Sequence, residues 1–333
     1  MLELRSFRIR HPNPRMTSPD SFKAPTRSEW RRTQWLALAL TFAALALAVM
    51  WQRWGGTIED SLAYFNTARY LRGEIPFSEL RAPFPYRVTI PALAARWPGD
   101  LRNGFATLNW LATAGTAITL SYLVFRAGGD RRRVVLAGLL AIVSVPTYWY
   151  APYLLTDPGA IFGRTVFALG VVTGQPWLAL AGGLFATTVR EENILLLVWL
   201  TAFGRVGFVR GGAVLALAAA WLVVVRWWLF PGLPSYLWVP NIGTVIAALR
   251  DHRSLMSLVS AGIVVIPLAV LAWRHVPERI RPLRIILLMM AVPPLYAALS
   301  VRIEGRAIWS LYPFLIPIAV FAPLPGLIRR REK

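Results

Sequence analysis

The sequence contains no cysteine, so it forms no disulfide, no thiolate metal site and no thiol nucleophile. Lysine is almost absent too, because Lys23 and Lys333 are the only two among 36 basic residues. Only 16 residues are acidic, which leaves a net charge of +20. The three histidines, His11, His252 and His275, are too scattered to make a metal site. In contrast, 56% of the residues are hydrophobic, a composition that indicates a membrane protein.

Long apolar runs recur along most of the 333 residues. A helix needs about 20 apolar residues to cross a bilayer. The sequence therefore predicts an all-α, polytopic integral membrane protein of about ten transmembrane helices, and no soluble C-terminal domain follows them. The runs lie at 35–51, 104–125, 134–150, 158–174, 177–189, 193–203, 212–230, 254–273, 285–300 and 310–327. The predicted membrane domain, residues 35–327, lies between two basic tails, 1–34 and 328–333.

The basic residues are placed for contact with membrane lipids. A pI near 11.4 is also typical of nucleic-acid-binding proteins. Such proteins gather their charge on a soluble face, whereas here it lies in short loops between apolar runs. We therefore expect no nucleic-acid partner.

Charge asymmetry predicts the orientation in the membrane. With the N-terminus in the cytoplasm, the segments "RAGGDRRR", "GRVGFVRG", "RHVPERIRPLR" and "RRREK" all fall on the cytoplasmic side. This agrees with the positive-inside rule for a bacterial cytoplasmic (inner) membrane, with both termini in the cytoplasm. Runs 177–189 and 193–203 are short, and they form either two spans or one broken helix around "REEN". The charge bias favours two spans.

Most carboxylates then lie on the non-cytoplasmic face. Ten of the 16 acidic residues fall there, including Glu59 and Asp60 at the start of the longest outer loop, residues 52–103. Later in that loop the segment "PFPYR" holds Tyr86 and Arg87 between prolines that stiffen the backbone. This face is where we expect a functional site.

The order of these motifs resembles the GT-C superfamily, the polytopic glycosyltransferases that take sugars from polyprenyl-phosphate carriers. The resemblance covers residues 35–203: the first span, an acidic residue early in the first outer loop, "PFPYR", the outer "TDP", and "LAGGLFATTVREENILLL". It implies transfer of a sugar from a polyprenyl-phosphate donor to a lipid, glycan or protein acceptor. The family's catalytic carboxylate maps onto Asp60, with Glu59 beside it, and its second acidic site maps onto Asp157.

Glycosyl transfer with inversion needs a carboxylate to deprotonate the acceptor and cations to hold the leaving phosphate. Asp60 suits the first role, although it also suits a helix cap for residues 61–72. The expected phosphate ligands, each of which is equally suited to a lipid headgroup, are Arg87, Arg190, Arg302 and Arg306.

Asp157 precedes a proline, which is a helix-start signal and favours a capping role. Arg164 lies two turns further on the same helix face, where it snorkels to the surface, pairs with Asp157 or contacts a lipid phosphate. Glu191 belongs to "VREEN", which is either a polar turn or the edge of a substrate groove. Metal ligation by Asp60 and Asp157 through oxygen, with Mg²⁺ or Mn²⁺, stays open.

Two other functions stay open. A transporter or flippase for a lipid-linked saccharide needs a polar path across the bilayer, and the apolar runs contain few polar residues near their middles. A non-catalytic scaffold of envelope assembly would not depend on the carboxylate of Asp60.

Overall fold

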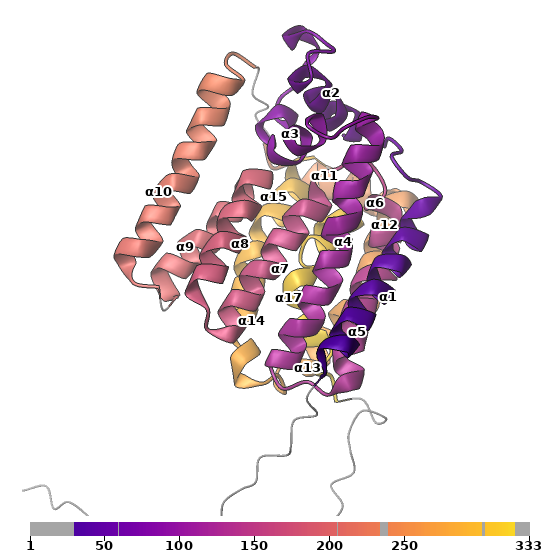
Figure 1. The fold of residues 1–333 in the computed structure, drawn as a ribbon, viewed down its shortest axis with the longest axis vertical. Helices are drawn as coiled ribbons and strands as arrows, with labels where there is room; N and C mark the ends of the chain where they lie inside the picture. The colour runs from indigo at the N-terminus through magenta and orange to yellow at the C-terminus, as the bar shows by residue number, and fades with distance from the viewer. Residues whose placement is uncertain (1–29, 59, 205, 234–238, 302–303, 324–333) are drawn as a thin grey trace, which may run out of the picture. The chain divides into compact units, whose positions relative to one another are not determined.

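The computed structural model describes residues 30–58, 60–204, 206–233, 239–301 and 304–323 (Figure 1). Contacts divide the chain into a short unit, Met1–Ala37, and a main unit, Leu38–Lys333. The described residues form helices and no strands. In chain order the elements are α1 (Arg32–Trp51), α2 (Ser61–Leu71), η1 (Phe77–Glu79), η2 (Phe84–Tyr86), α3 (Thr89–Ala95), α4 (Leu101–Arg126), α5 (Arg131–Ile142), α6 (Val145–Tyr150), α7 (Asp157–Thr173), α8 (Pro176–Val189), η3 (Glu191–Asn193), α9 (Ile194–Phe203), α10 (Phe208–Val224), the π-helical η4 (Val225–Leu229), α11 (Ile242–Arg250), α12 (His252–Gly262), α13 (Val265–Ala272), η5 (Glu278–Ile280), α14 (Pro282–Met290), α15 (Val292–Ser300), α16 (Gly305–Trp309) and α17 (Tyr312–Ala319).

Several helical segments have the length and composition of membrane spans. Five described segments qualify: Arg32–Trp51, Leu101–Arg126, Arg131–Tyr150, Phe208–Leu229 and Glu278–Ser300. Helices α12 and α13 make a sixth if their 43° bend interrupts a single span. By contrast α7, α8 and α9 have 17, 14 and 10 residues, fewer than the ~20 of a full crossing. The all-helical class is therefore confirmed, and the count of ten spans stays a prediction.

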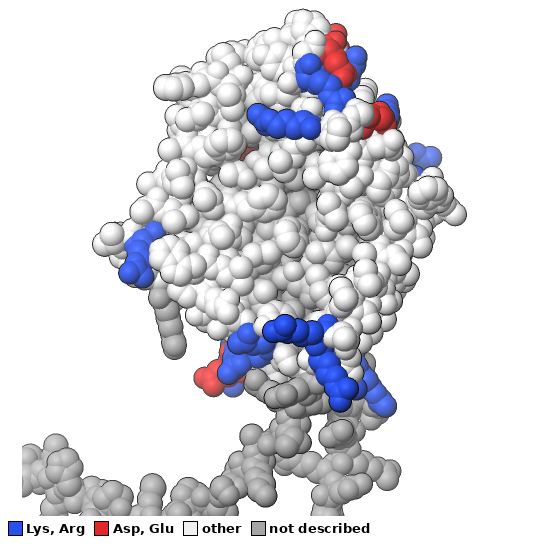
Figure 2. Space-filling model, viewed as in Figure 1, with Lys and Arg blue, Asp and Glu red and all other residues white. Residues whose placement is uncertain are grey.

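Charge is distributed as a membrane would require. In Figure 2 the arginine side chains gather toward the two ends of the drawn face, and a broad belt between them is almost uncharged. Large apolar side chains are exposed on the helices, among them Leu217 on α10 and Leu288 on α14. Exposed apolar side chains of this kind are compatible with contact with lipid tails, whereas their exposure to water is unfavourable in free energy.

Residues 52–58 and 60–100 form a small helical unit, here called the loop lobe, at the end of α4 (Figure 1). Helix α2 packs mainly on α3 and η2 within it. Arg72, at the C-cap of α2, donates hydrogen bonds to four carbonyl oxygens around the end of α3, those of Ala94, Ala95, Trp97 and Gly99. A cation suits this position because the last carbonyls of a helix lack partners and carry partial negative charge. The loop lobe is therefore an ordered unit.

Helices α7 and α8 pack with their backbones in close approach. A Cβ atom added at Gly170 would lie 2.3 Å from the amide nitrogen of Ala179, and one at Gly182 would lie 2.4 Å from that of Phe167. Small residues allow this approach, which is a common packing mode of helices in lipid. The contact fixes the position of Asp157 at the start of α7 relative to the end of α8.

The chain reverses direction after α8. The turn Glu191–Asn193 leads into α9, which runs back beside α8, so that a Cβ at Gly183 would lie 2.7 Å from the side chain of Leu197 (Figure 1). Of the two arrangements that the sequence left open for residues 177–203, the structure has two short helices in a hairpin. The turn carries the charges of "REEN" toward α7.

Candidate functional site

Asp60 lies at the N-cap position of α2, but its side chain accepts no hydrogen bond from the helix amides. Its Oδ2 instead accepts a 3.0 Å hydrogen bond from Nη1 of Arg306. The side chain remains 39% exposed. Asp60 is therefore the N-cap residue of α2 by position, as one of the two interpretations predicts, but its carboxylate is directed at a residue of α16.

Asp157 is the first residue of α7, as its position before proline predicts, and Thr156 occupies the N-cap position. The side chain is 2% exposed and contacts two arginines. Oδ1 accepts a hydrogen bond from Arg190, and Oδ2 lies 2.9 Å from Nη2 of Arg306. The predicted helix start is confirmed for Asp157, and its predicted capping role is wrong. Arg306 therefore bridges Asp157 and Asp60.

Arg306 owes its position to the packing of α16 on α12 and α6. The backbone of Gly305 lies so close to α12 that a Cβ there would be 2.2 Å from the carbonyl oxygen of Ser257. The Gly305 amide donates to Oγ of Ser257 at 2.9 Å. At the other end of α16, Nε1 of Trp309 donates to Oγ1 of Thr147 at 3.0 Å. The glycine of "EGR" thus serves to bring the arginine against the start of α7.

Arg164 is fully enclosed and makes three polar contacts. Nη2 lies 3.0 Å from Oε1 of Glu192, Nη1 donates to the carbonyl oxygen of Ser310 at 2.7 Å, and Nε donates to Oδ1 of Asn193. Because its side chain is only 2% exposed, Arg164 does not reach lipid, and it forms its ion pair with Glu192 instead of Asp157. Glu192 also accepts a 2.7 Å hydrogen bond from Nε of Arg190.

Arg87 joins the loop lobe to the turn after α8. Its Nε and Nη2 donate to the two carboxylate oxygens of Glu191 at 3.1 and 3.2 Å. Its Nη1 donates to the hydroxyl oxygen of Tyr64 on α2 at 2.6 Å. The paired geometry is the one that a guanidinium fork favours with a carboxylate. We call Arg87, Arg164, Arg190, Arg306 and the four carboxylates that they contact, Asp60, Asp157, Glu191 and Glu192, the ion-pair network.

The ion-pair network contains four cations and four anions, so its formal charge is balanced. Burial by itself raises the pKa of Glu191, but the attraction of Arg87 outweighs it and lowers that pKa to about 2. For Glu192, burial is again opposed by nearby arginines, Arg190 and Arg164, and the net result is a lowered pKa. Both carboxylates are therefore ionised at neutral pH, as their pairing requires.

The remaining predicted site residues lie apart from this network or outside the described residues. Tyr86 donates through its hydroxyl to the carbonyl oxygen of Leu233 at 3.4 Å, and Arg226 lies over its ring at 5.0 Å. Glu59 and Arg302 lie outside the described residues. The proline-rich segment "PFPYR" thus presents its arginine to the network and its tyrosine elsewhere.

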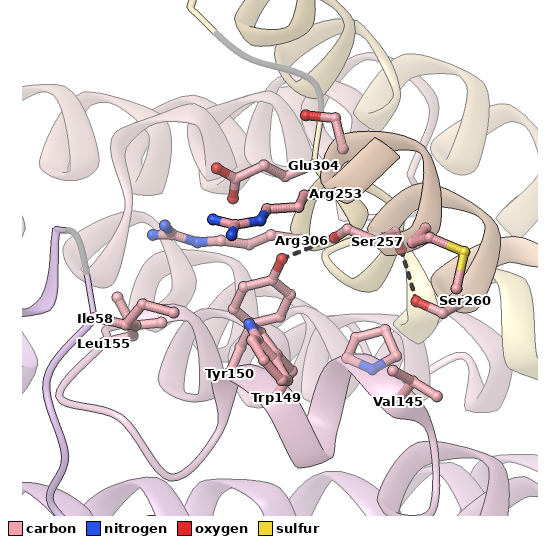
Figure 3. Close-up of a pocket in the computed structure, with 13 residues that line it drawn as sticks. Ile58, Val145, Trp149, Tyr150, Leu155, Arg253, Ser257, Ser260, Glu304 and Arg306 are labelled. Atoms are coloured by element: carbon pink, nitrogen blue, oxygen red, sulfur yellow. Dashed lines mark hydrogen bonds between the residues drawn. The ribbon is translucent and has the colours of Figure 1, made fainter. Parts of the chain in front are cut away.

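A cavity of about 620 Å³ adjoins Arg306. Figure 3 shows Glu304, Arg253 and Arg306 extending across it in the same direction, with Tyr150 beneath them. Tyr150 is fixed by a 3.1 Å hydrogen bond with Ser257. The apolar side of the lining comes mainly from α6, with Val145, Pro146 and Trp149, whereas α12 contributes Met256 together with three serines, Ser254, Ser257 and Ser260. The volume is in the range of small-molecule sites, and a wall that is apolar on one side and charged on the other suits an amphiphile with a polar head.

Sequence reasoning missed Arg253, Trp149 and Tyr150 as lining residues of the cavity. Arg253 lies in "DHRS", where Asp251 caps α12 by accepting from the amides of Arg253 and Ser254. That capping motif was readable from the sequence, but it does not indicate which way the arginine side chain extends. The two aromatic residues end the predicted run 134–150 and match the pattern of an interfacial belt.

The arrangement also bears on metal ligation. Asp60 and Asp157 both face the guanidinium of Arg306, which occupies the position between them. Within the described ranges, no three or more His, Cys, Asp or Glu side chains are grouped as a metal site would need. Binding of Mg²⁺ or Mn²⁺ by these two carboxylates stays a prediction and would require Arg306 to move.

Comparison with protein-family models, with curated proteins and with solved structures finds no match to this chain.

Proposed function

We propose that this chain is a GT-C-like membrane glycosyltransferase that transfers a sugar from a polyprenyl-phosphate-linked donor to a lipid, glycan or protein acceptor. The proposal places it in a bacterial inner membrane, with about ten spans, both termini in the cytoplasm and the site on the non-cytoplasmic face. One observation carries the proposal. A partly exposed carboxylate, Asp60, is hydrogen-bonded to an arginine that lines a cavity with one apolar wall.

In this proposal Asp60 is the general base. As the acceptor oxygen forms its bond to the anomeric carbon, its proton passes to the Asp60 carboxylate. The bond between the anomeric carbon and the phosphate oxygen breaks, and its electron pair stays on the phosphate. Glycosyl transfer of this kind conserves charge and needs no redox partner. The preceding residue, Glu59, is proposed to assist the base.

The leaving phosphate gains negative charge, which Arg306 and Arg253 are placed to stabilise from the cavity wall. These two are better placed than Arg87 and Arg190, because both line the cavity, whereas Arg87 and Arg190 are not among its lining residues. Val145, Trp149 and Met256 would pack against the first isoprenyl units of the donor. Asp157 then acts on Arg306 as a second counterion.

The test is transfer of labelled sugar from a panel of polyprenyl-phosphate donors in proteoliposomes, with Asp60→Asn compared to the native chain at equal folded amounts. We expect Asp60→Asn to lose turnover by about 100-fold or more while donor binding is retained. Glu74→Gln is the matched control, because Glu74 is a carboxylate of the same loop that pairs with Arg69. Full turnover in Asp60→Asn would contradict the assignment of the base. Absence of turnover in the native chain across all donors would favour the transporter.

A further inference from the structure

Helix α2 is attached to the rest of the main unit by two chains of polar contacts. Asp60 and Tyr64 are four residues apart and therefore lie on one face of the helix. Asp60 binds Arg306 at 3.0 Å, and Tyr64 binds Arg87 at 2.6 Å. Arg87 continues to the α8–α9 turn through Glu191. Both chains thus connect the loop lobe to helices that are distant in sequence.

The two attachments differ in burial. The Asp60 side chain is 39% exposed, while Tyr64 is 0% exposed and Arg87 keeps only 10% of its side chain exposed. The ring of Tyr64 also packs edge-on against Phe84, with 5.3 Å between ring centroids. An exposed ion pair contributes little and exchanges readily, whereas a buried charge-assisted hydrogen bond is strong and directional. The Tyr64 attachment is therefore the more rigid of the two.

The greater rigidity of the Tyr64 attachment is important for catalysis if Asp60 is the base, so the inference rests on the proposed function. When Asp60 accepts a proton it loses its charge, and its attraction to Arg306 weakens at the step that needs α2 held in place. We propose that Tyr64 and Arg87 are positioning residues, which hold α2 against the α8–α9 turn so that Asp60 stays aligned while its own ion pair is broken. Neither residue contacts the reacting atoms in this scheme.

The residue types fit this role. The hydrogen bond between Tyr64 and Arg87 does not involve Asp60, so it remains in place when Asp60 is protonated. Arg87 holds both oxygens of Glu191 and still has Nη1 for Tyr64, which the point charge of a lysine does not reproduce. Thr89 adds a further hydrogen bond from the start of α3 to the carbonyl oxygen of Thr188, at 2.6 Å.

The decisive experiment is a double-mutant cycle in the labelled-sugar assay. Tyr64→Phe removes one hydroxyl and keeps the ring against Phe84. We expect kcat to fall about tenfold or more, because small displacements of a catalytic group are costly, while the donor KM changes less than about twofold. In an Asp60→Asn background, Tyr64→Phe should cause no further loss of kcat, since it acts through Asp60. Tyr70→Phe is the matched control on the same helix, where the ring packs on Phe77 and Phe230.

A second measurement requires no substrate. Because the chain has no cysteine, two cysteines introduced by Leu62→Cys on α2 and Leu111→Cys on α4 would be the only sites that a thiol-reactive spin label modifies. Both positions are exposed. Tyr64→Phe and Arg87→Gln should broaden the distribution of distances between the labels, and Tyr70→Phe should leave it narrow.

Each outcome is decisive. A native kcat in Tyr64→Phe, or equal losses in the native and Asp60→Asn backgrounds, would overturn the positioning role. If the native chain transfers no sugar from any donor, the proposed function fails, and the attachment of α2 is then decided by the label distances. A distribution unchanged by Tyr64→Phe and Arg87→Gln would overturn it too.

Discussion

Arg306 and Asp60 are 246 positions apart in the sequence and are joined by a 3.0 Å hydrogen bond. The same guanidinium contacts Asp157 at 2.9 Å, so one arginine of α16 is the common counterion of the two carboxylates that the GT-C resemblance singles out. Of the two, Asp157 is buried and Asp60 partly exposed. Removing the arginine should therefore affect folding through Asp157 and turnover through Asp60.

Arg306→Gln should lower the free energy of unfolding by about 3–5 kcal/mol, the usual result of leaving a buried charge with part of its pairing removed. The midpoint of thermal unfolding in detergent measures this. Arg250→Gln, at an exposed arginine on α11, is the control and should change the midpoint little. Adding Asp157→Asn to Arg306→Gln should restore part of the loss, because the stranded charge is then removed. An unchanged midpoint in Arg306→Gln would mean that the bridge does not form.

Acid should destabilise the protein through Glu191. Its pKa falls from the ordinary 4.5 to about 2 on folding, so the pairing with Arg87 stabilises the fold above pH 4.5 and is lost as the pH falls toward 2. We expect the unfolding midpoint to decline across that window. In Glu191→Gln the decline should be smaller, while midpoints near pH 7 should already be lower than in the native chain. Parallel pH curves for the two proteins would refute the linkage.

Gly305→Ala should displace α16, because the added Cβ would lie 2.2 Å from a backbone oxygen of Ser257. Overpacking of this kind costs about 1–3 kcal/mol. Gly212→Ala is the control: that glycine lies within α10, and apart from the adjacent backbone of α10 no atom lies within 4 Å of the added Cβ, so alanine should be neutral or stabilise the helix slightly. Turnover of Gly305→Ala should also fall, since Arg306 follows Gly305. Equal stability and activity of the two variants would argue against the close approach of α16 and α12.

The sequence predicts the helices better than it predicts the site. Apolar runs and prolines mark α4 and the start of α7, because period and capping chemistry are local properties. The pairing of Arg164 with Glu192 depends instead on the hairpin of α8 and α9, which brings a turn beside the second turn of α7. The spacing along α7 suggested Asp157 as the partner of Arg164, whereas tertiary packing brings Glu192 to it instead.

The roles of the carboxylates show the same limit. A short polar residue before a helix is usually a cap, and Asp100 and Asp251 do cap α4 and α12. Asp60 stands at the N-cap position of α2 and does not, because its backbone is helical (φ −62°, ψ −19°), whereas the backbones of Asp100 and Asp251 are extended, as side-chain capping requires. Its carboxylate instead binds Arg306 of α16. A contact between residues far apart in the chain, such as that of Arg306 with Asp60, produces no recognisable pattern in the sequence around either residue. Sequence reasoning therefore found the acidic residues but did not predict that Arg306 binds two of them, Asp60 and Asp157.

The orientation of the chain in the membrane is still a prediction, and the absence of cysteine makes it easy to test. Ser78→Cys places an exposed thiol in η1 of the loop lobe, with a change of one atom, and His275→Cys places another in the segment "RHVPERIRPLR". With the basic segments in the cytoplasm, a membrane-impermeant maleimide should label Ser78→Cys in intact spheroplasts and should label His275→Cys only after permeabilisation. The unmodified chain should not be labelled under either condition. Labelling of both thiols in intact spheroplasts would refute the prediction that residues 78 and 275 lie on opposite sides of the membrane. The reverse pattern would place the loop lobe and Asp60 in the cytoplasm, where a donor presented on the outer leaflet does not reach them.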